Sequence, residues 1–347
     1  MLLILICPYV EVDAISAIAL VTGANGFLGR YIVEQLLERG SRVRAFCRSR
    51  DDHLEQLGAE LHLGDIRDRE AVCAACGGID VVYHAAGVAG IWGPWERFHS
   101  INTAGTAHVI DGCRQRAVPK LVYTSSPSVT FDGRPQEGID ESAPYSSRWL
   151  CHYPHTKALA EQAVLAANDD QLATCSLRPH LIWGPRDRHL VPRLLQRARA
   201  GQLKRVGDGT NLVDMIYVEN AAAAHLRAAD VLGPRTAVAG RAYFISQGEP
   251  VNCWAWINQI LNFSGIPAVQ KAISMGAAWR IGHALECVHR LFGIEREPRM
   301  TRFLAAQLGG SHYFDIERAR NDFGYSPQVS TNEGMVRLGN WLADGKK

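Results

Sequence analysis

The chain of 347 residues is long enough to bury a sizeable core, and its content of 47% hydrophobic and 21% charged residues is ordinary for a soluble protein. The formal net charge of +2, with no block of basic residues, excludes the electrostatic footprint of a nucleic-acid-binding protein. Nine cysteines without a regular spacing favour reduced thiols inside a cell over a secreted disulfide framework. These totals predict one large domain, or one domain with a smaller appended lobe.

The apolar run at residues 1–7 is too short to span a membrane, and no Lys or Arg precedes it, so it does not predict a signal peptide. Glu11 and Asp13 follow it. Residues 1–16 are therefore interpreted as an extension before the first strand. Three forms of this extension stay open: a loose tail, an edge strand or the product of an early start codon. We expect a cytoplasmic protein.

Three glycines stand between a predicted strand over residues 17–21 and a helix whose apolar residues include Tyr31, Val33 and Leu36. At such a turn the first glycine makes the tight bend, the second lets the backbone approach a pyrophosphate, and the third allows close packing. Free N–H groups at the helix start face the anion. The turn therefore predicts dinucleotide binding. The residues expected to contact the cofactor are Gly23, Asn25, Gly26, Phe27, Leu28 and Gly29.

The second predicted strand, residues 42–47, ends where the cofactor is selected. A carboxylate that binds the ribose of NAD is expected about 20 residues after the glycines, but Cys47 stands there with Arg48 beside it. A cation suits the 2′-phosphate of NADP, so NADP is preferred and Arg48 is predicted to contact it. Arg44 and Arg50 add positive charge nearby. Asp51 and Asp52 lie close enough to bind a ribose, so NAD stays open as the alternative cofactor.

A strand over residues 61–63 ends in Gly64-Asp65-Ile66, and one over 81–84 ends in Ala85-Ala86-Gly87, whose small side chains leave room for a cofactor. His84 is interpreted as a core histidine. Cys73 and Cys76 lack a second pair of ligands, so residues 68–76 are interpreted as an ordinary surface helix, and no metal site is predicted.

Residues 88–98 are predicted to form a loop in which aromatic residues alternate with Gly and Pro. Trp92, Trp95 and Phe98 in this loop form either a wall of the substrate pocket or a cap on the core. A helix over residues 102–116 and a strand over 121–124 follow.

The chemistry is predicted from Tyr153 and Lys157, which share one face of a helix that Tyr153 opens. A neighbouring ammonium favours the phenolate and lowers the pKa of the tyrosine, so Tyr153 is expected to exchange a proton with a carbonyl or alcohol oxygen near neutral pH. Ser126 ends the preceding strand and is expected to donate a hydrogen bond to the same oxygen, with Ser125 as the alternative.

Residues 22–29, the pair Tyr153 and Lys157, and Ser126 together resemble an extended short-chain dehydrogenase/reductase, specifically the 3β-hydroxysteroid dehydrogenase family. The spacing G-x-x-G-x-x-G is that of the superfamily. Residues 178–187 and 207–214 resemble the segments that close over the nicotinamide and begin the substrate lobe. The resemblance covers nearly the whole chain.

The resemblance implies an α/β fold: a doubly wound parallel sheet of the Rossmann type with a smaller C-terminal substrate lobe. The NAD(P)-binding domain would comprise residues 17–180 with return segments around 213–246, and the lobe residues 181–212 and 247–347. The implied cofactor contacts are Asp65, Ile66, Ala85, Ala86, Gly87, Thr124, Tyr153, Lys157 and Pro179, the last beside the nicotinamide. The expected substrate contacts are Trp92, Ser126 and Trp183.

In the return segments, residues 213–218 and 243–246 read as strands, and Asn220 is predicted to cap a helix over 221–229. Helices are predicted over 254–261 and 274–292. The second carries an apolar stripe that either packs against the lobe or forms a lid over an acyl chain and touches a membrane surface: Ile281, Leu285, Val288 and Phe292. A cluster of cations either holds an acidic substrate group or is solvated: Arg193, Arg197, Arg199, Lys204 and Arg205.

The resulting hypothesis is hydride transfer between NADP(H) and the 3-position of a hydrophobic β-keto or β-hydroxy acid. Segments 161–170, 178–187 and 181–214 resemble members of the family that reduce 2-alkyl-3-oxoalkanoates in olefin synthesis or oxidise sterol 4α-carboxylates in steroid synthesis. Reduction of a 2-alkyl-3-oxoalkanoate is preferred. The alternatives are a 3β-hydroxysteroid dehydrogenase, a sugar-nucleotide epimerase or dehydratase, and a cofactor sensor without turnover. Resemblance implies a homodimer, and contacts with a membrane surface or pathway enzymes stay open.

Overall fold

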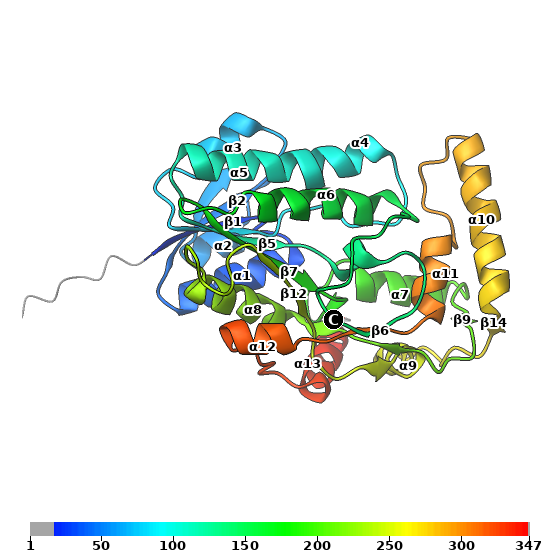
Figure 1. Cartoon of the computed structure of the whole chain (residues 1–347). Coiled ribbons are helices and arrows are strands. Elements are labelled where there is room, and N and C mark those ends of the chain that lie inside the picture. Colours follow the sequence, from blue (N-terminus) through cyan, green and yellow to red (C-terminus); the bar gives the residue numbers. More distant parts are fainter. Residues whose placement is uncertain (1–16, 346–347) are drawn as a thin grey trace, which may run out of the picture.

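A parallel sheet of seven strands forms the centre of the protein (Figure 1). We describe residues 17–345 in a computed structural model, so the predictions for residues 1–16 lie outside the described part. From edge to edge the strands are β12 (Arg241–Ile245), β7 (Ala173–Pro179), β5 (Lys120–Thr124), β4 (Val81–His84), β1 (Ile18–Thr22), β2 (Arg42–Cys47) and β3 (Glu60–Leu63). Strand order reverses between β1 and β4, where open α/β sheets bind their ligands at the carboxyl ends.

Helices cover both faces of this sheet, which confirms the doubly wound prediction (Figure 1). One face carries α1 (Phe27–Glu38), α8 (Val218–Val231) and α12 (Glu317–Phe323), and the other carries α3 (Arg69–Ala75), α5 (Gly105–Gln115) and α6 (His152–Ala166). Val, Leu, Ile and Ala residues of the strands point alternately into the two cores, as expected for a sheet buried on both sides. Short α2 (Asp52–Gln56) lies between β2 and β3, and α13 (Thr331–Asp344) ends the described chain.

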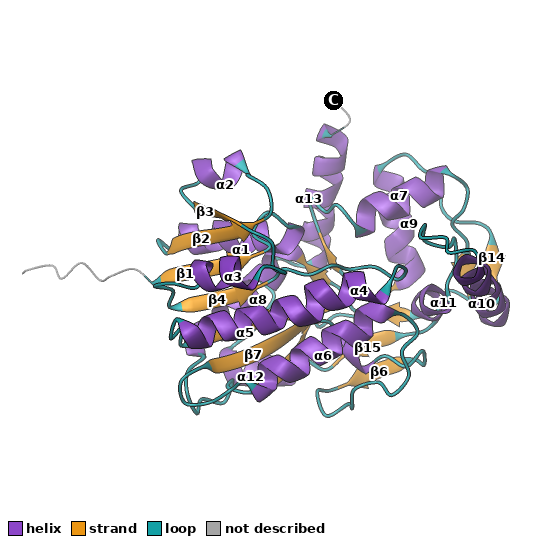
Figure 2. Ribbon diagram, turned by 90° about the horizontal axis from the view of Figure 1, so that it is seen from above, coloured by secondary structure: helices purple, strands orange, loops and turns teal. Residues whose placement is uncertain are grey.

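A lobe of helices and short strands lies beyond the carboxyl ends of the central strands (Figure 2). Its helices are α7 (Leu190–Arg199), α9 (Cys253–Phe263), α10 (Met275–Leu291) and α11 (Arg302–Gly309). One small sheet has the order β13 (Val251–Asn252), β10 (Leu212–Val213), β15 (His312–Phe314) and β6 (Gln136–Ile139). Two pairs are β11 (Ile216–Tyr217) with β8 (Ile182–Trp183), and β14 (Ala272–Ile273) with β9 (Arg205–Val206). Within residues 17–345, none of the helices combines the length and the apolar character that a bilayer crossing needs.

The helix predicted over residues 102–116 begins earlier than expected. Short α4 (Trp95–Phe98) starts after Pro94 and continues through a π-helical segment, η1 (His99–Ala104), into α5. Of the loop predicted over residues 88–98, only residues 88–94 are non-helical. Hydrophobic periodicity did not reveal the join because a π-helical turn shifts the helical phase. Phe98 is buried in the core, whereas Trp92 and Trp95 are half-buried.

Asn220 does not cap a helix. α8 begins at Val218, and the Asn220 side chain lies inside it, where its amide nitrogen donates to Gln247 Oε1 and to the carbonyl of Val329, both at 2.7 Å. Its amide oxygen accepts from the N–H of Val329 at 3.0 Å. Asn220 thus joins α8 to the chain before α13, and these distant partners replace the local cap that the sequence predicted.

Candidate active site

The glycine turn depends on the absence of side chains. Gly23 has a positive φ of +66°, and a Cβ there would lie 2.8 Å from the Cα of Ala86 at the end of β4. A Cβ on Gly29 would lie 2.2 Å from the carbonyl oxygen of Gly23. The turn is therefore pressed against both its own helix and the neighbouring strand end, as a cradle for a pyrophosphate requires.

Gly29→Ala is expected to lower the free energy of unfolding by about 1–3 kcal/mol, because the added methyl collides with rigid backbone. Chemical denaturation measures this loss, and a fluorescence titration with NADPH should show weaker binding as the turn shifts. Gly276→Ala is the matched control, since a Cβ at Gly276 meets open space. A Gly29→Ala variant as stable as the wild type would contradict the packing role of this glycine.

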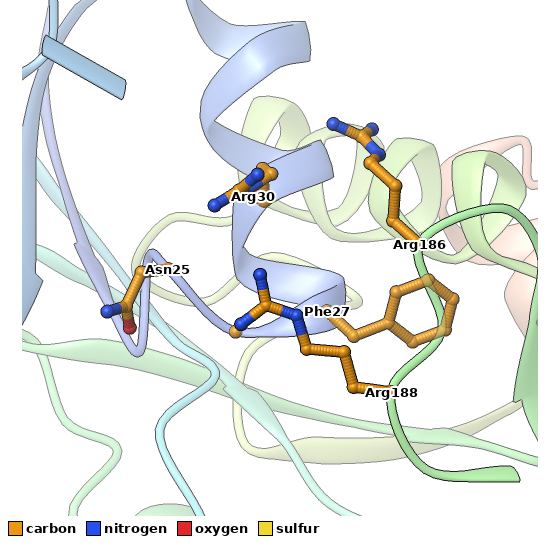
Figure 3. Close-up of a pocket in the computed structure, with 6 residues that line it drawn as sticks. Asn25, Phe27, Arg30, Arg186 and Arg188 are labelled. Atoms are coloured by element: carbon orange, nitrogen blue, oxygen red, sulfur yellow. The ribbon is translucent and has the colours of Figure 1, made fainter. Parts of the chain in front are cut away.

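A positively charged pocket lies beside the turn (Figure 3). Its lining residues are Asn25, Gly26, Phe27, Arg30, Arg186 and Arg188. Arg30 is bonded to Asp51, whereas exposed Arg188 has no carboxylate partner among residues 17–345. Backbone N–H groups at the start of α1 and the guanidinium group of Arg188 suit an anion. The side chain of Leu28, a predicted cofactor contact, packs into the core from the first turn of α1, so only its backbone can face a cofactor.

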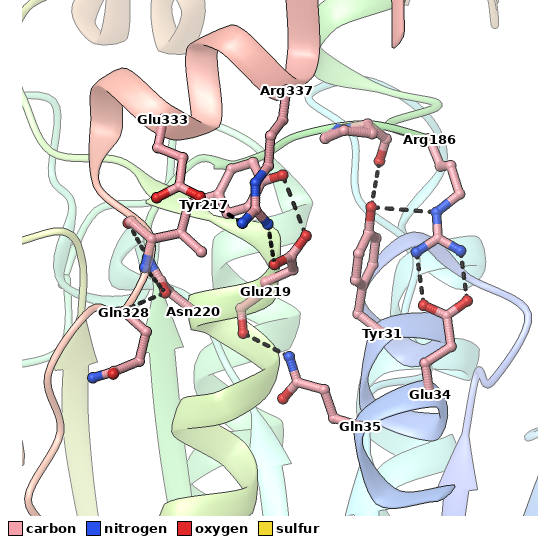
Figure 4. A network of polar contacts seen from close by, with 12 residues as sticks. Tyr31, Glu34, Gln35, Arg186, Tyr217, Glu219, Asn220, Gln328, Glu333 and Arg337 are labelled. Carbon is pink, nitrogen blue, oxygen red and sulfur yellow. Dashed lines mark hydrogen bonds and ion pairs between the residues drawn. The ribbon is translucent and has the colours of Figure 1, made fainter. Parts of the chain in front are cut away.

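Arg186 holds the loop after β8 against α1 (Figure 4). Its guanidinium donates two hydrogen bonds to Glu34, at 2.6 and 2.7 Å, and lies 3.9 Å from the centre of the Tyr31 ring. The Tyr31 hydroxyl donates to the carbonyl of Pro185 at 3.0 Å. The loop that carries Arg188 is thereby fixed beside the glycine turn.

Of the three arginines near the end of β2, Arg48 alone has no ion-pair partner in the described chain. Arg44 is bonded to Glu60 at 3.0 Å, and Arg50 to Asp52 at 3.1 Å. Arg44 is therefore a structural residue rather than a contributor to cofactor choice, and the charge of Arg50 is largely offset. Arg48 is exposed beyond the strand end, where a cofactor ribose would lie.

The acids near this strand end are also engaged. Asp51 caps α2 by accepting from the N–H of Leu54 at 3.3 Å, and it pairs with Arg30. At the end of β3, the Arg67 guanidinium lowers the pKa of Asp65 to about 2, so Asp65 is ionised. The buried thiol of Cys47 donates to the carbonyl of Ser49 at 3.2 Å and offers no carboxylate to a ribose.

The end of β4 brings the glycine turn close to the predicted catalytic residues. The N–H of Ala86 donates to Thr22 Oγ1 at 3.2 Å, and a Cβ on Gly87 would lie 4.0 Å from Lys157 Nζ. Ala85 and Gly87 thus lie between the turn and Lys157. Ile66, after β3, packs against α5: a Cβ on Gly105 of α5 would lie 2.9 Å from the Ile66 side chain.

His84 is a core residue, as predicted. Both ring nitrogens are hydrogen-bonded, to Thr22 Oγ1 at 2.7 Å and to Thr106 Oγ1 at 2.9 Å. Burial, with a smaller contribution from the charge of Lys157, lowers the pKa of His84 to about 3, so the ring is neutral.

Lys157 is buried beneath the carboxyl ends of β4 and β5. Its ammonium donates to the carbonyl oxygen of Thr124 at 2.5 Å and lies 4.2 Å from the centre of the Tyr123 ring. The Thr124 hydroxyl is hydrogen-bonded to His225 at 2.8 Å. Pro179 ends the neighbouring strand β7 at the same edge of the sheet. Burial lowers the pKa of Lys157 to about 7, although the carboxylate of Glu161 acts in the opposite direction.

This low pKa predicts a pH-dependent stability. Between about pH 7 and pH 10.5 the unfolded chain binds the Lys157 proton and the folded chain does not, so the contribution of Lys157 to the free energy of unfolding rises with pH. The difference between wild type and Lys157→Met should rise by up to about 1.4 kcal/mol per pH unit. Urea unfolding at pH 7 and pH 9 measures it, and a difference that falls with pH would contradict a depressed lysine pKa.

Tyr153 lies in the first turn of α6, as predicted, but its protonation differs from the prediction. Burial raises the pKa of Tyr153, the nearby Ser126 hydroxyl acts in the opposite direction, and the Cys151 thiol adds to the rise. The expectation that Lys157 lowers the pKa of Tyr153 is therefore wrong for the protein without cofactor. The Lys157 ammonium is held at the Thr124 carbonyl, and desolvation dominates at Tyr153.

Ser126 is better placed for chemistry than Ser125. Ser126 is partly exposed at the start of a 3₁₀ helix, η2 (Pro127–Thr130), and its hydroxyl is hydrogen-bonded to Ser128 Oγ at 2.8 Å. Ser125 is buried. The geometry therefore brings Ser126, Tyr153 and Lys157 to one edge of the sheet, beside Gly87.

Two residues of this region were missed by the sequence reasoning. Asn102, buried in η1, accepts from the N–H of Val88 at 2.8 Å and donates to Thr156 Oγ1 at 3.2 Å, so it ties the loop after β4 to α6. π-Helical turns are frequent at functional sites, but the sequence carried no visible sign of this one. The second is Glu161, one helical turn beyond Lys157. This i, i+4 spacing could have indicated a carboxylate on the same helix face as Lys157.

The carboxylate of Glu161 is the centre of a buried polar network. It accepts from Arg178 Nη2 at 2.6 Å, from the Tyr145 hydroxyl at 2.8 Å and from Ser176 Oγ at 2.9 Å. Glu161 is fully buried and Arg178 nearly so. The network fixes the inner face of α6 against β7, and thereby the position of Lys157.

The two tryptophans predicted to contact the substrate lie in different environments. The Trp92 indole donates to the carbonyl of Ile294 at 3.0 Å, so it joins the loop after β4 to the lobe. Trp183 has no exposed surface and packs edge-on against Tyr217 and Trp256, with ring centres 5.3 and 5.8 Å apart. Trp183 is thus a core residue of the lobe rather than a substrate contact.

The cationic cluster of the lobe is partly neutralised. Arg193 and Arg197 both pair with Glu297, the second at 2.8 Å, so neither is free for an acidic substrate group. Residues 17–345 contain no group of three or more His, Cys, Asp or Glu arranged to hold a metal ion. Cys73 lies on α3 and Cys76 caps it, and both are free thiols.

The family model described as the 3-beta hydroxysteroid dehydrogenase/isomerase family matches residues 20–275. A 2-alkyl-3-oxoalkanoate reductase of Stenotrophomonas maltophilia (strain K279a) is 49% identical over 321 residues, which cover 92% of this chain and 97% of the relative. A sterol-4-alpha-carboxylate 3-dehydrogenase (decarboxylating) of Mus musculus is 36% identical over 324 residues, covering 91% of this chain and 88% of the relative.

Solved structures share the fold. The crystal structure of gox2253 superposes with a TM-score of 0.77 at 24% identity, covering 95% of this chain and 99% of that chain. MoeE5 in complex with UDP-glucose and NAD gives a TM-score of 0.73 at 22% identity, with the same coverage. These identities show the fold alone, whereas the family model and the closer relatives show the family. The chain belongs to the 3-beta hydroxysteroid dehydrogenase/isomerase family and is an NAD(P)-dependent oxidoreductase.

Proposed function

We propose that this protein reduces the 3-oxo group of a hydrophobic 2-alkyl-3-oxo acid, with NADPH as the preferred cofactor. The observation that carries the proposal is the convergence of Ser126, Tyr153 and Lys157 beside Gly87, at the strand ends that flank the glycine turn. The 49% identity to a 2-alkyl-3-oxoalkanoate reductase supports the choice of substrate.

The chain's own residues would position and protonate the substrate oxygen. The nicotinamide supplies the hydride when it is bound. The Ser126 hydroxyl donates a hydrogen bond to the carbonyl oxygen, and the Tyr153 hydroxyl transfers its proton to the same oxygen. Lys157, beside Gly87, would hold the ribose next to the nicotinamide.

The protonated form of Tyr153 is the form that ketone reduction uses. Reduction of a ketone needs a proton donor at the oxygen, whereas oxidation of an alcohol needs a base. Because burial raises the pKa of Tyr153, its phenol keeps the proton at neutral pH and is ready to donate it.

A cluster of apolar side chains near the site supports a hydrophobic substrate. Phe131, which follows η2, packs edge-on against Phe303 of α11 with ring centres 5.6 Å apart. Leu150, just before α6, belongs to the same cluster, as does Trp279 of α10. The chain segments that carry Ser126 and Tyr153 thus meet the lobe through apolar contacts, which suit an alkyl chain better than a sugar.

Cofactor preference is tested at Arg48. A 2′-phosphate bound by this guanidinium would gain about 1.5–3 kcal/mol, so Arg48→Gln is expected to raise the KM for NADPH by about ten- to a hundredfold while the KM for NADH stays nearly unchanged. Initial rates with both cofactors measure this. Arg50→Gln is the matched control, because Arg50 is equally exposed but engaged by Asp52. Equal effects on both cofactors would contradict the assignment.

The substrate is tested by following NADPH and NADH oxidation with a racemic long-chain 2-alkyl-3-oxo acid and, in parallel, a 3-oxosteroid. Rapid oxidation with the acid alone supports the proposal. Activity with the steroid alone would favour the second candidate, a sterol dehydrogenase. The 36% identity to a sterol-4-alpha-carboxylate 3-dehydrogenase supports this candidate. Inactivity with both substrates would overturn both assignments.

A further inference from the structure

The outer face of α10 is the largest concentration of exposed apolar side chains in the described chain. α10 forms the rim of the molecule, far from the central sheet (Figures 1 and 2). Five of the eleven exposed large hydrophobic residues lie on it or just beyond its end: Ile281, Val288, Leu291, Phe292 and Ile294. Leu291 is 79% exposed and Phe292 70%. We call these five residues the α10 apolar face. Of the two interpretations of the stripe, packing against the lobe holds only for half-buried Leu285, because Ile281, Val288 and Phe292 are exposed.

The orientation of α10 is fixed from its other side. A Cβ on Gly282 would lie 2.6 Å from the backbone carbon of Thr301, so α10 is in close contact with the start of α11. The buried carboxylate of Glu286 accepts from the N–H of Arg302 at 2.7 Å and from its Nε at 2.8 Å. Because this inner face is tightly held, the α10 apolar face cannot turn inward to bury itself.

The chain segments that carry the α10 apolar face also carry an excess of positive charge. Five exposed cations lie on α10 or in the segments that flank it: Lys271, Arg280, Arg290, Arg296 and Arg299. Of the three acids in this stretch, Glu286 is buried beside Arg302 and lies 3.9 Å from Arg290, and Glu297 pairs with Arg193 and Arg197. Only Glu295 is exposed without such a pair among residues 17–345. Exposed apolar side chains within a net positive surface fit an anionic lipid headgroup layer.

We propose that the α10 apolar face docks the protein onto an anionic membrane surface. Leu291 and Phe292 would enter the boundary between headgroups and acyl chains, and the surrounding arginines would contact lipid phosphates. The helix would lie in the plane of the surface rather than cross it.

This docking would place the loop after β4 and the start of α6, which carries Tyr153, at the membrane. The Trp92 indole binds the carbonyl of Ile294, and Trp279 of α10 packs with Leu150, next to the start of α6. A lipid leaving the bilayer along α10 would therefore reach Tyr153 past apolar side chains. This delivery role rests on the proposed function, whereas the docking itself does not.

Vesicle sedimentation with the full chain tests the docking, without cofactor or substrate. Wild type is expected to bind vesicles of phosphatidylcholine with phosphatidylglycerol and to bind phosphatidylcholine alone much more weakly. The double variant Leu291→Ser/Phe292→Ser should lose binding by at least about tenfold, because two apolar side chains no longer leave water. Arg296→Gln/Arg299→Gln should lose about tenfold on the anionic vesicles alone.

Val336→Ser is the matched control, since Val336 is a 60% exposed apolar residue on α13 and its loss should leave binding unchanged. Because the substituted side chains are exposed, unchanged thermal unfolding is expected for every variant. Failure of the wild type to bind, or equal binding to neutral vesicles, would overturn the proposal. A dimer in sedimentation equilibrium that the Leu291→Ser/Phe292→Ser variant abolishes would show that a second copy covers the face, and would also overturn it.

Failure of the docking and failure of the proposed function are distinguishable. A short-chain, water-soluble 2-alkyl-3-oxo acid needs no membrane, so its reduction should proceed at wild-type rate in Leu291→Ser/Phe292→Ser. If the wild type does not reduce the short-chain acid, the proposed function is contradicted and the docking is not.

Discussion

Tyr153→Phe is expected to lower kcat by about 10²- to 10⁴-fold, because the substitution removes the proton donor and leaves the ring in place. Cofactor binding should persist, since the glycine turn and Lys157 are untouched. The measurement is NADPH oxidation with a 2-alkyl-3-oxo acid, combined with an NADPH titration by fluorescence.

Tyr313→Phe is the control for this experiment. Tyr313 lies on β15 of the small lobe sheet, and its hydroxyl makes no hydrogen bond within residues 17–345. Its loss should leave kcat unchanged. Turnover of Tyr153→Phe within a fewfold of wild type would refute the role of Tyr153 as proton donor and would reopen the interpretation of the protein as a cofactor sensor.

Glu161→Gln should lower the free energy of unfolding by about 3–5 kcal/mol, since it leaves the buried guanidinium of Arg178 without its counter-charge. The free energy of unfolding should be largely restored in Glu161→Gln/Arg178→Met, because this variant leaves no buried charge unpaired. Urea denaturation of the two variants and the wild type measures both effects.

The same substitution should change the titration of Lys157. Glu161 acts against the effect of burial, so without it the pKa of Lys157 should fall below about 7. The pH at which Lys157 loses its proton, followed by NMR of a specifically labelled lysine, should therefore move down. An unchanged midpoint would mean that Glu161 supports the packing of α6 and not the charge of Lys157.

Much of the local structure around the glycine turn was predictable from the sequence because its constraints are local. Gly23 and Gly29 are required by a positive φ and by close backbone approach, and such constraints leave a direct mark on residue choice. The ends of β4 and β5, just before Ala85 and Ser125, followed from short continuous apolar runs, which are typical of strands buried on both faces. The start of α6 was predicted to within one residue, at Tyr153 instead of His152, because Pro154 is tolerated only in a first helical turn.

The errors came from contacts between segments far apart in the chain. Trp183 is buried because Tyr217 and Trp256 come from other elements, and Asn220 finds partners near Val329. The pKa of Tyr153 is set by how much of the chain closes around it, which no local pattern encodes. The exposure of the α10 apolar face is a further case, since periodicity identifies an apolar stripe but not what covers it.

The path of the chain between the sheet and the lobe has a thermodynamic consequence. β6 leaves the nucleotide-binding half to complete the lobe sheet beside β15, while β12 and α8 return from the lobe to cover β7 and β5. No single cut separates the two parts: a fragment ending at residue 180 would expose the edge of β7 and the part of the sheet that α8 and α12 cover. The two parts therefore share one folding transition, and damage to the lobe is transmitted to cofactor binding through stability rather than through direct contact.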